Sequence, residues 1–136
     1  MTSELLAAVK LSEGFRDKVY KCTEGYDTIG YGFAIKDLVL DEDMCEKILE
    51  RKISEIKLRI DQKLPFISEL PEIVQDVIVE MCYQMGVSGF SKFKKTIDHL
   101  MRNDFPSAAR EMLDSRWAVQ TPNRAKKLSN YVKNAR

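Results

Sequence analysis

Residues 18–33, KVYKCTEGYDTIGYGF, differ from the rest of the chain in their residue pattern. Val19-Tyr20 and residues 26–31 form two short strand-like runs, and the turn-like Thr23-Glu24-Gly25 separates them. Glycines near the end of the second run allow the backbone to bend sharply. We therefore predict a small, glycine-bent β-hairpin lobe over about residues 15–40.

The segments on both sides of this lobe carry helical patterns. Thr2 or Ser3 can cap a first helix that Gly14 ends, which places Glu13 at the carboxyl end of that helix. After the lobe, apolar residues recur every three or four positions and predict one long connecting helix over about residues 41–62.

The second half of the chain predicts a mainly helical lobe over about residues 66–136. A nearly buried helix is expected from Pro71 to Gly86, followed by shorter helices. Their marker residues are Phe90, Phe93, Ile97 and Leu100 for one, Pro106, Ala108, Ala109, Met112 and Leu113 for the next, and Thr121, Pro122, Leu128 and Val132 for the last. The expected class is α+β in a single domain, 1–136, with the first helix packed on the helical lobe and a cleft between the lobes.

Composition excludes several kinds of function. The 136 residues carry 22 basic and 21 acidic side chains, so no overall charge favours nucleic acid or an anionic membrane. The three cysteines, Cys22, Cys45 and Cys82, form no CxxC pair, and we expect neither a metal site, nor a cofactor, nor a disulfide framework. The first residues do not form a signal peptide and no run is long enough to span a membrane, so we expect no stable membrane insertion.

Glu13 is the first candidate for chemistry. The negative end of a helix and partial burial both disfavour an ionised carboxylate, and a protonated carboxyl can act as a general acid. Spacing alone is weak evidence, because a glutamate beside a helix-ending glycine is usually a solvated surface residue.

A family resemblance changes that balance. Several blocks, in the same order and with matching internal spacing, resemble the phage-type lysozymes, also called endolysins or muramidases, and in particular their T-even members. These blocks are Glu13-Gly14-Phe15-Arg16, Tyr20-Lys21, Thr23-Glu24-Gly25-Tyr26, Thr28-Ile29-Gly30-Tyr31-Gly32, Tyr83-Gln84-Met85-Gly86, Ser115-Arg116-Trp117 and Gln120-Thr121-Pro122-Asn123-Arg124-Ala125. Between Lys36 and Pro65 the chain looks some twenty residues shorter than the T-even type, which implies a shortened β lobe.

The resemblance implies a lysozyme-like fold and an activity. The family reaction is hydrolysis of the β-1,4 bond between N-acetylmuramic acid and N-acetylglucosamine in peptidoglycan, leading to bacterial lysis. Glu13 would then protonate the leaving group, and the Thr28 hydroxyl would orient the catalytic water. Arg124 would hold the Glu13 carboxyl and favour its ionised form.

The resemblance also suggests residues that contact the glycan. Tyr83, Gln84 and Trp117 match residues near the floor of the cleft, and Thr96 stands where the family has a sugar-contacting serine. Core packing is the better explanation for Trp117, while Tyr83 fits either role. Arg124 also fits a plain surface helix residue.

Cys22 is the largest departure from the family, which usually has an aspartate there. A thiol has a reference pKa of about 8.5, so it is a poor base unless its surroundings favour the thiolate. Three readings stay open: a nucleophile that retains configuration and allows transglycosylation, a weaker base that inverts it, or an inactivating or engineered change that leaves a peptidoglycan-binding module. We favour participation in catalysis, because Glu13 and Thr28 are preserved.

Three further departures concern the surroundings of the site. Phe33 replaces a structural histidine, Glu111 replaces a sugar-binding asparagine, and Ala34 replaces a leucine. The subsites for sugar are therefore less well specified than the catalytic centre.

The expected partners and location follow from the same resemblance. The enzyme is expected to be a monomer that binds peptidoglycan glycan strands and no nucleic acid. Without an export signal it would stay in the host bacterial cytoplasm until a holin-type pore opened a route to the wall.

Overall fold

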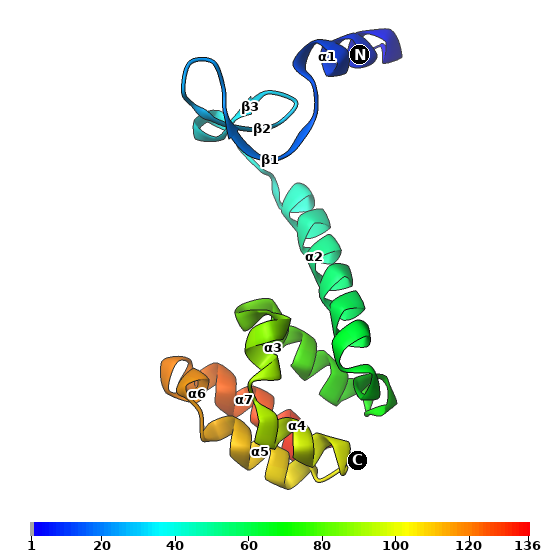
Figure 1. Cartoon of the computed structure of the whole chain (residues 1–136), viewed down its shortest axis with the longest axis vertical. Helices are drawn as coiled ribbons and strands as arrows, with labels where there is room; N and C mark the ends of the chain where they lie inside the picture. The colour runs from blue at the N-terminus through cyan, green and yellow to red at the C-terminus, as the bar shows by residue number, and fades with distance from the viewer. Residues whose placement is uncertain (1) are drawn as a thin grey trace. The chain divides into compact units, whose positions relative to one another are not determined.

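The structure is a computed structural model that describes residues 2–136, and it confirms the α+β class (Figure 1). The chain divides into two compact units, Met1–Cys45 and Glu46–Arg136. We call them the hairpin unit and the helical unit and describe each by itself. Among residues 2–136 no helix has the length and apolar character required to cross a bilayer.

The hairpin unit begins with α1, Ser3–Glu13. The Thr2 side chain caps it by accepting a hydrogen bond from the Leu5 N–H, as the sequence predicts. Gly14 ends it with a φ of 70°, a conformation that glycine adopts without strain. Glu13 is therefore the last residue of the helix.

A small antiparallel sheet follows α1 in the order β1-β2-β3. Its strands are β1, Arg16–Lys21, β2, Asp27–Gly30, and β3, Phe33–Ala34. The β1–β2 register pairs Tyr20 with Thr28, and β2–β3 pairs Thr28 with Ala34. The predicted hairpin is present, and β3 is an addition, because two residues are too few to give a periodic signal.

The turn between β1 and β2 is closed by Cys22. Its N–H donates to the Tyr26 carbonyl at 3.0 Å, and its own carbonyl accepts from the Gly25 N–H at 2.9 Å. Gly25 has a φ of 85°, which explains the glycine at this position. The η1 turn, Ile35–Asp37, then leads out of the sheet.

The long helix expected over about residues 41–62 is α2, Glu42–Lys63. Asp41 Oδ1 accepts a hydrogen bond from the Met44 N–H at 2.9 Å and so caps its first turn. The η2 turn, Pro65–Glu69, follows directly, because proline cannot continue the hydrogen-bond pattern of a helix.

The helical unit holds α3, Glu72–Ser91, α4, Lys94–Met101, α5, Phe105–Leu113, α6, Arg116–Gln120, and α7, Pro122–Lys133. The first helical part of α3 ends at Gly86 as the sequence predicts, because φ is 81° and ψ is 159° there. One correction concerns Phe90, which lies in the short helical segment between this kink and Ser91 and not in the helix that holds Ile97 and Leu100. Helix α6 was not predicted, because its five residues are too few for an amphipathic pattern.

The apolar core of the helical unit is built mainly from α3, α5 and α7. Helix α3 supplies the expected buried face, with Val74, Ile78 and Met81 at most 1 % exposed. Phe90 is fully buried and stacks on Phe93 with ring centroids 6.0 Å apart. This packing fixes the ends of α3 and α4, on which several candidate residues lie.

Candidate active site

The three residues that the sequence proposes for catalysis line one pocket of the hairpin unit. The pocket has a volume of about 330 Å³, and Glu13, Cys22 and Thr28 come to it from α1, the β1–β2 turn and β2. Its other lining residues are Tyr20, Glu24, Tyr26, Gly32, Ala34, Lys36 and Asp37.

Glu13 lies against the backbone of Gly32. A Cβ atom at Gly32 would overlap Oε2 of Glu13, and the φ of Gly32 is +75°. Only glycine satisfies both conditions without a shift of the carboxylate. The Glu13 side chain is exposed on this unit, so the partial burial expected from the sequence is not provided by its neighbours here. From the sequence Gly32 was expected only to bend the backbone, and its contact with Glu13 was not predicted.

Cys22 is half-buried at the turn, with its thiol in a polar setting. Backbone hydrogen bonds from Tyr26 and then Glu24 lower the pKa of the Cys22 thiol, and the Thr28 hydroxyl contributes a smaller lowering. In contrast, burial raises the pKa of Cys82 to about 12. The surroundings of Cys22 thus favour a thiolate, which is the form that acts as a nucleophile or a base.

Thr28 is the one buried residue of the described part of the hairpin unit, with 3 % of its surface exposed. It occupies the central strand, and its Oγ1 donates to the Tyr26 carbonyl at 2.9 Å. The hydroxyl has one hydrogen, so it serves either this carbonyl or the Cys22 thiolate at a given moment. With its hydrogen on Tyr26, Oγ1 can accept a hydrogen bond from water.

The rim of the pocket carries more acidic than basic groups. Glu24 and Asp37 line it together with Glu13, and Lys36 is the basic residue of the lining. The Lys36 ammonium is 3.9 Å from the centre of the Tyr26 ring, so this cation is held over the aromatic face. Across the β1–β2 pair, Lys21 and Asp27 form an ion pair of 2.8 Å. The pocket thus brings together a carboxyl group from Glu13, a thiol from Cys22 and a hydroxyl from Thr28.

The departures at Phe33 and Ala34 have local explanations. The Phe33 ring packs so close to Gly30 that a Cβ atom there would collide with it. It also meets the Tyr31 ring edge-on at 6.4 Å, so an aromatic cluster occupies the place of the family histidine. Ala34 lines the pocket with a small side chain and leaves it open at this point.

In the helical unit, Gln84 and Trp117 form one pair. Trp117 Nε1 donates to Gln84 Oε1 at 2.9 Å, and only 7 % of Trp117 is exposed. Trp117 belongs to the apolar core, which confirms the packing role expected for it. Tyr83 precedes Gln84 in α3, and 46 % of its surface is exposed. Its surface is open to a ligand.

Arg124 forms an ion pair with Glu80, a residue that no sequence motif indicated. Its Nε donates to Oε2 of Glu80 at 2.8 Å, linking α7 to α3. The two positions are 44 residues apart, so no local spacing could have identified the pair. The ion pair fixes the guanidinium on the surface of the helical unit.

Thr96 and Glu111 lie together in a separate pocket of the helical unit, about 420 Å³ in volume. Thr96 is 2 % exposed and Glu111 is half-buried. Tyr83, Gln84 and Arg124 line neither this pocket nor the one around Glu13.

The chain is similar to known proteins over most of its length. Residues 10–133 match the sequence model of the family described as phage lysozyme. The chain is 26 % identical to "Probable T4-type lysozyme 1" of Dictyostelium discoideum, over 97 % of the chain and 95 % of the relative. It is 30 % identical to "Probable T4-type lysozyme 2" of the same organism, over 94 % and 92 %.

A third relative is a larger protein. The chain is 28 % identical to the "Pre-baseplate central spike protein Gp5" of Enterobacteria phage T4. The alignment covers 91 % of this chain and 26 % of that protein. The alignment with the first relative spans 162 residues, more than the 136 of this chain, so this chain lacks residues that the relative has. A shortened member of the family is consistent with that difference.

Proposed function

Because the chain belongs to the phage lysozyme family and is a glycoside hydrolase, we propose that it cleaves the β-1,4 bond between N-acetylmuramic acid and N-acetylglucosamine in peptidoglycan. The observation that carries this proposal is the pocket shared by Glu13, Cys22 and Thr28. A glycosidase needs an acid for the leaving oxygen and a second group for the anomeric carbon or for water.

Glu13 supplies the proton in this proposal. Its protonated carboxyl donates to the glycosidic oxygen, the C–O bond breaks, and the departing sugar leaves as an alcohol. Gly32 holds the carboxyl group by its close approach and so limits the positions that it can take.

Two routes complete the reaction, and the lowered pKa of Cys22 favours its participation in both. In one, the thiolate bonds to the anomeric carbon, and water deprotonated by the Glu13 carboxylate later displaces the sulfur, with retention of configuration. In the other, the thiolate removes a proton from a water that Thr28 orients, and this water attacks directly with inversion. An alcohol in place of water in the first route gives transglycosylation.

The decisive experiment on the acid is Glu13→Gln. The variant should fold normally and lose clearing of a purified wall suspension, because an amide cannot donate a carboxyl proton. Near-normal clearing would overturn the assignment. The anomeric configuration of the fresh product, together with an intact-mass search for a glycosyl adduct on Cys22, separates the two routes.

The competing proposal is a catalytically weakened peptidoglycan-binding module, and its support is the loss of the family aspartate at Cys22. Binding of walls without clearing by the unmodified chain would favour it over the enzyme.

For the biological setting we propose host-cell lysis. The monomeric enzyme would accumulate in the bacterial cytoplasm and reach the wall through a holin-type pore, with bacteriolytic and antimicrobial action as the result. Tyr83, Gln84, Thr96 and Arg124 would bind the glycan. The route is tested by measuring lysis of bacterial cells that express the chain, with and without a pore-forming protein.

A further inference from the structure

Among residues 2–45, three cations lie over the rings of tyrosines. Lys36 Nζ is 3.9 Å from the centre of the Tyr26 ring, which is the shortest of the three distances. The other two pairs are Arg16 over Tyr20 at 4.7 Å and Lys10 over Tyr31 at 5.7 Å. Attraction to the negative face of an aromatic ring restricts the positions that a cation takes. Lys36 is therefore the most closely held of these cations.

Lys36 is also the cation that reaches the Glu13 pocket. Lys36 and Tyr26 both line this pocket, whereas the other two cations do not. Lys36 belongs to the η1 turn, and η1 packs against β2, the strand that carries Thr28. The ammonium group is thus held at the wall of the pocket that contains the proposed catalytic groups.

The other charged groups of the pocket lining are acidic, namely Glu13, Glu24 and Asp37. None of the ion pairs among residues 2–136 includes Lys36 or one of these three carboxylates. An anionic ligand is therefore repelled by most of the wall and attracted at one point, next to the Lys36 ammonium. Such an arrangement contributes more to the orientation of a ligand than to its overall affinity.

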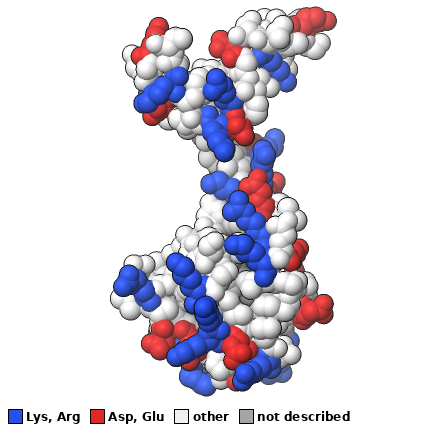
Figure 2. Space-filling view, in the orientation of Figure 1, with Lys and Arg blue, Asp and Glu red and all other residues white. Residues whose placement is uncertain are grey.

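The surface as a whole does not attract anions strongly. The chain carries 22 basic and 21 acidic side chains, and Figure 2 shows both kinds interspersed on the visible face of each unit. Neighbouring charges of opposite sign weaken each other's field at a distance. Recognition of a negative group therefore depends on an individual contact such as the one that Lys36 offers.

The two sugars of peptidoglycan differ in charge. N-acetylglucosamine is neutral, whereas N-acetylmuramic acid has a lactyl arm that ends in a carboxylate or in a stem peptide with carboxylates of its own. We infer that Lys36, held over the Tyr26 ring, is a specificity-determining residue of the Glu13 pocket that binds a carboxylate of the lactyl arm or of its stem peptide. The inference rests on the proposed function for its substrate. The ammonium donates hydrogen bonds to the carboxylate oxygens, and the ring keeps it at the pocket wall.

The first test measures binding without bond cleavage, by NMR titration of the full chain. One probe is N-acetylmuramoyl-L-alanyl-D-isoglutamine, which has a free carboxylate, and the second is its carboxyl amide, which has none. The first probe should cause saturable shifts at Lys36 and Tyr26. The amide should bind about fivefold more weakly, a loss that corresponds to one exposed charge contact.

A third probe, free N-acetylmuramic acid, identifies the source of the carboxylate. Binding as tight as that of the dipeptide probe would assign the contact to the lactyl carboxylate. Weaker binding, similar to that of the amide, would assign it to the stem peptide.

Variants of the pair test the contact itself. Lys36→Gln should remove the difference between the carboxylate probe and its amide. Lys36→Arg should keep this difference, because a guanidinium retains both the charge and the attraction to the ring. Tyr26→Phe should keep it as well, whereas Tyr26→Leu should reduce it, because the ammonium is then no longer held.

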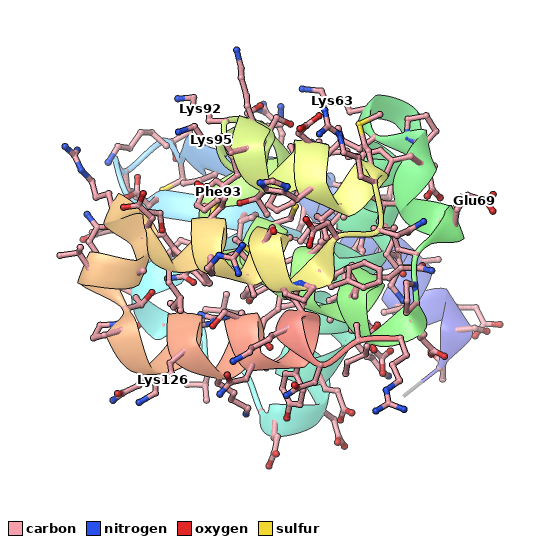
Figure 3. The ribbon with its side chains drawn as sticks, turned by 90° about the horizontal axis from the view of Figure 1, so that it is seen from below. Lys63, Glu69, Lys92, Phe93, Lys95 and Lys126 are labelled. Atoms are coloured by element: carbon pink, nitrogen blue, oxygen red, sulfur yellow. The ribbon has the colours of Figure 1, made fainter. Side chains whose placement is uncertain are left out.

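The matched control is Arg16→Gln, which removes a cation held over a tyrosine outside the pocket lining. Lys126→Gln removes the same charge from the helical unit, and Figure 3 shows Lys126 at the edge of that unit. Both controls should keep the difference between the probes, and its loss in either one would overturn the inference. Three other results would also overturn it: equal binding of acid and amide by the unmodified chain, a difference that persists in Lys36→Gln, or the absence of saturable shifts.

Kinetics with soluble wall fragments give a second readout. Lys36→Gln should raise KM about fivefold with little change in kcat, because it removes a contact that forms when substrate binds. A fall in kcat at constant KM would contradict the specificity role. The titration involves no bond cleavage, so its failure is distinct from a failure of Glu13→Gln to abolish clearing.

Discussion

Gly32 is the glycine of the hairpin unit whose backbone lies against the Glu13 carboxylate. An alanine there needs a positive φ and also displaces the Glu13 carboxylate. We predict that Gly32→Ala destabilises the unit by about 1–2 kcal/mol and lowers wall clearing more than this loss explains. Gly25→Ala is the control, because Gly25 has a φ of +85° and no atom near its added Cβ. Equal loss of clearing in both variants would show that backbone strain alone is responsible.

The ionisation of the Cys22 thiol should determine how wall-clearing activity rises with pH. Its lowered pKa means that the thiolate fraction rises with pH below the ordinary range of a thiol, and clearing should rise with it. Cys22→Asp should stay active and move this rise to lower pH, because a carboxylate ionises near pH 4. Cys22→Ser should lose most activity. A pH–rate profile of the three proteins checks this, and an unchanged Cys22→Ser profile would exclude a chemical role for sulfur.

The resemblance to a family singled out Glu13, Cys22 and Thr28, since spacing alone is weak evidence for such a site. These residues fall within one short stretch, so the helix end, the turn and the strand bring them to one pocket without long-range information. The contact of Gly32 with Glu13 depends on how the turn between β2 and β3 lies against the end of α1. The Glu80–Arg124 pair joins helices that are distant in sequence. Neither leaves a periodic signal.

At the scale of the element, helix ends could likewise be predicted from the sequence only where the signal is local. The caps of α1 and α2 follow from Thr2, Gly14 and Asp41, because capping depends on the nearest few residues. The break at Gly86 follows in the same way, because a glycine with positive φ usually ends a helix. The short helical segment between Gly86 and Ser91 does not, because so few residues give no periodic signal.

Asp104 gives α5 an acid-sensitive cap. Its carboxylate accepts the Ser107 N–H at 3.2 Å, and hydrogen bonds from the Ser107 side chain and backbone, with a smaller effect of His99, lower the pKa of Asp104. A lowered pKa in the folded state means that the stabilisation is present above the ordinary aspartate pKa and is lost as pH falls through the folded value.

We therefore predict that Asp104→Asn weakens the dependence of stability on pH below about 4 while keeping the cap. Asp104→Ala should lower stability at neutral pH as well. Urea unfolding of the full chain at several pH values measures both effects. If Asp104→Asn showed the same acid dependence as the unmodified chain, another carboxylate would have to be responsible.

On the scale of the whole molecule, the buried apolar residues are unevenly distributed. Every one of them that the structure describes falls between Ile60 and Val132, within the helical unit. In the described part of the hairpin unit Thr28 alone is buried. The stabilisation that the chain gains from burial of apolar surface thus comes mainly from the helical unit. The proposed catalytic groups belong to the hairpin unit.

This distribution predicts different behaviour for the two separated units. A fragment of residues 46–136 should fold alone and unfold cooperatively, because it contains the complete core around Phe90 and Trp117. A fragment of residues 1–45 should lack stable structure, since a small sheet without a buried apolar face is marginal in water. Circular dichroism with thermal unfolding measures both.

Phe90→Ala is the internal check on this prediction. It should destabilise the 46–136 fragment and the full chain by a similar amount, about 3–5 kcal/mol, because the cavity that it creates lies entirely among residues of the helical unit. A much smaller loss in the fragment would mean that its core is not the one described for the full chain. A cooperative transition in the 1–45 fragment would contradict the assignment of stability to the helical unit.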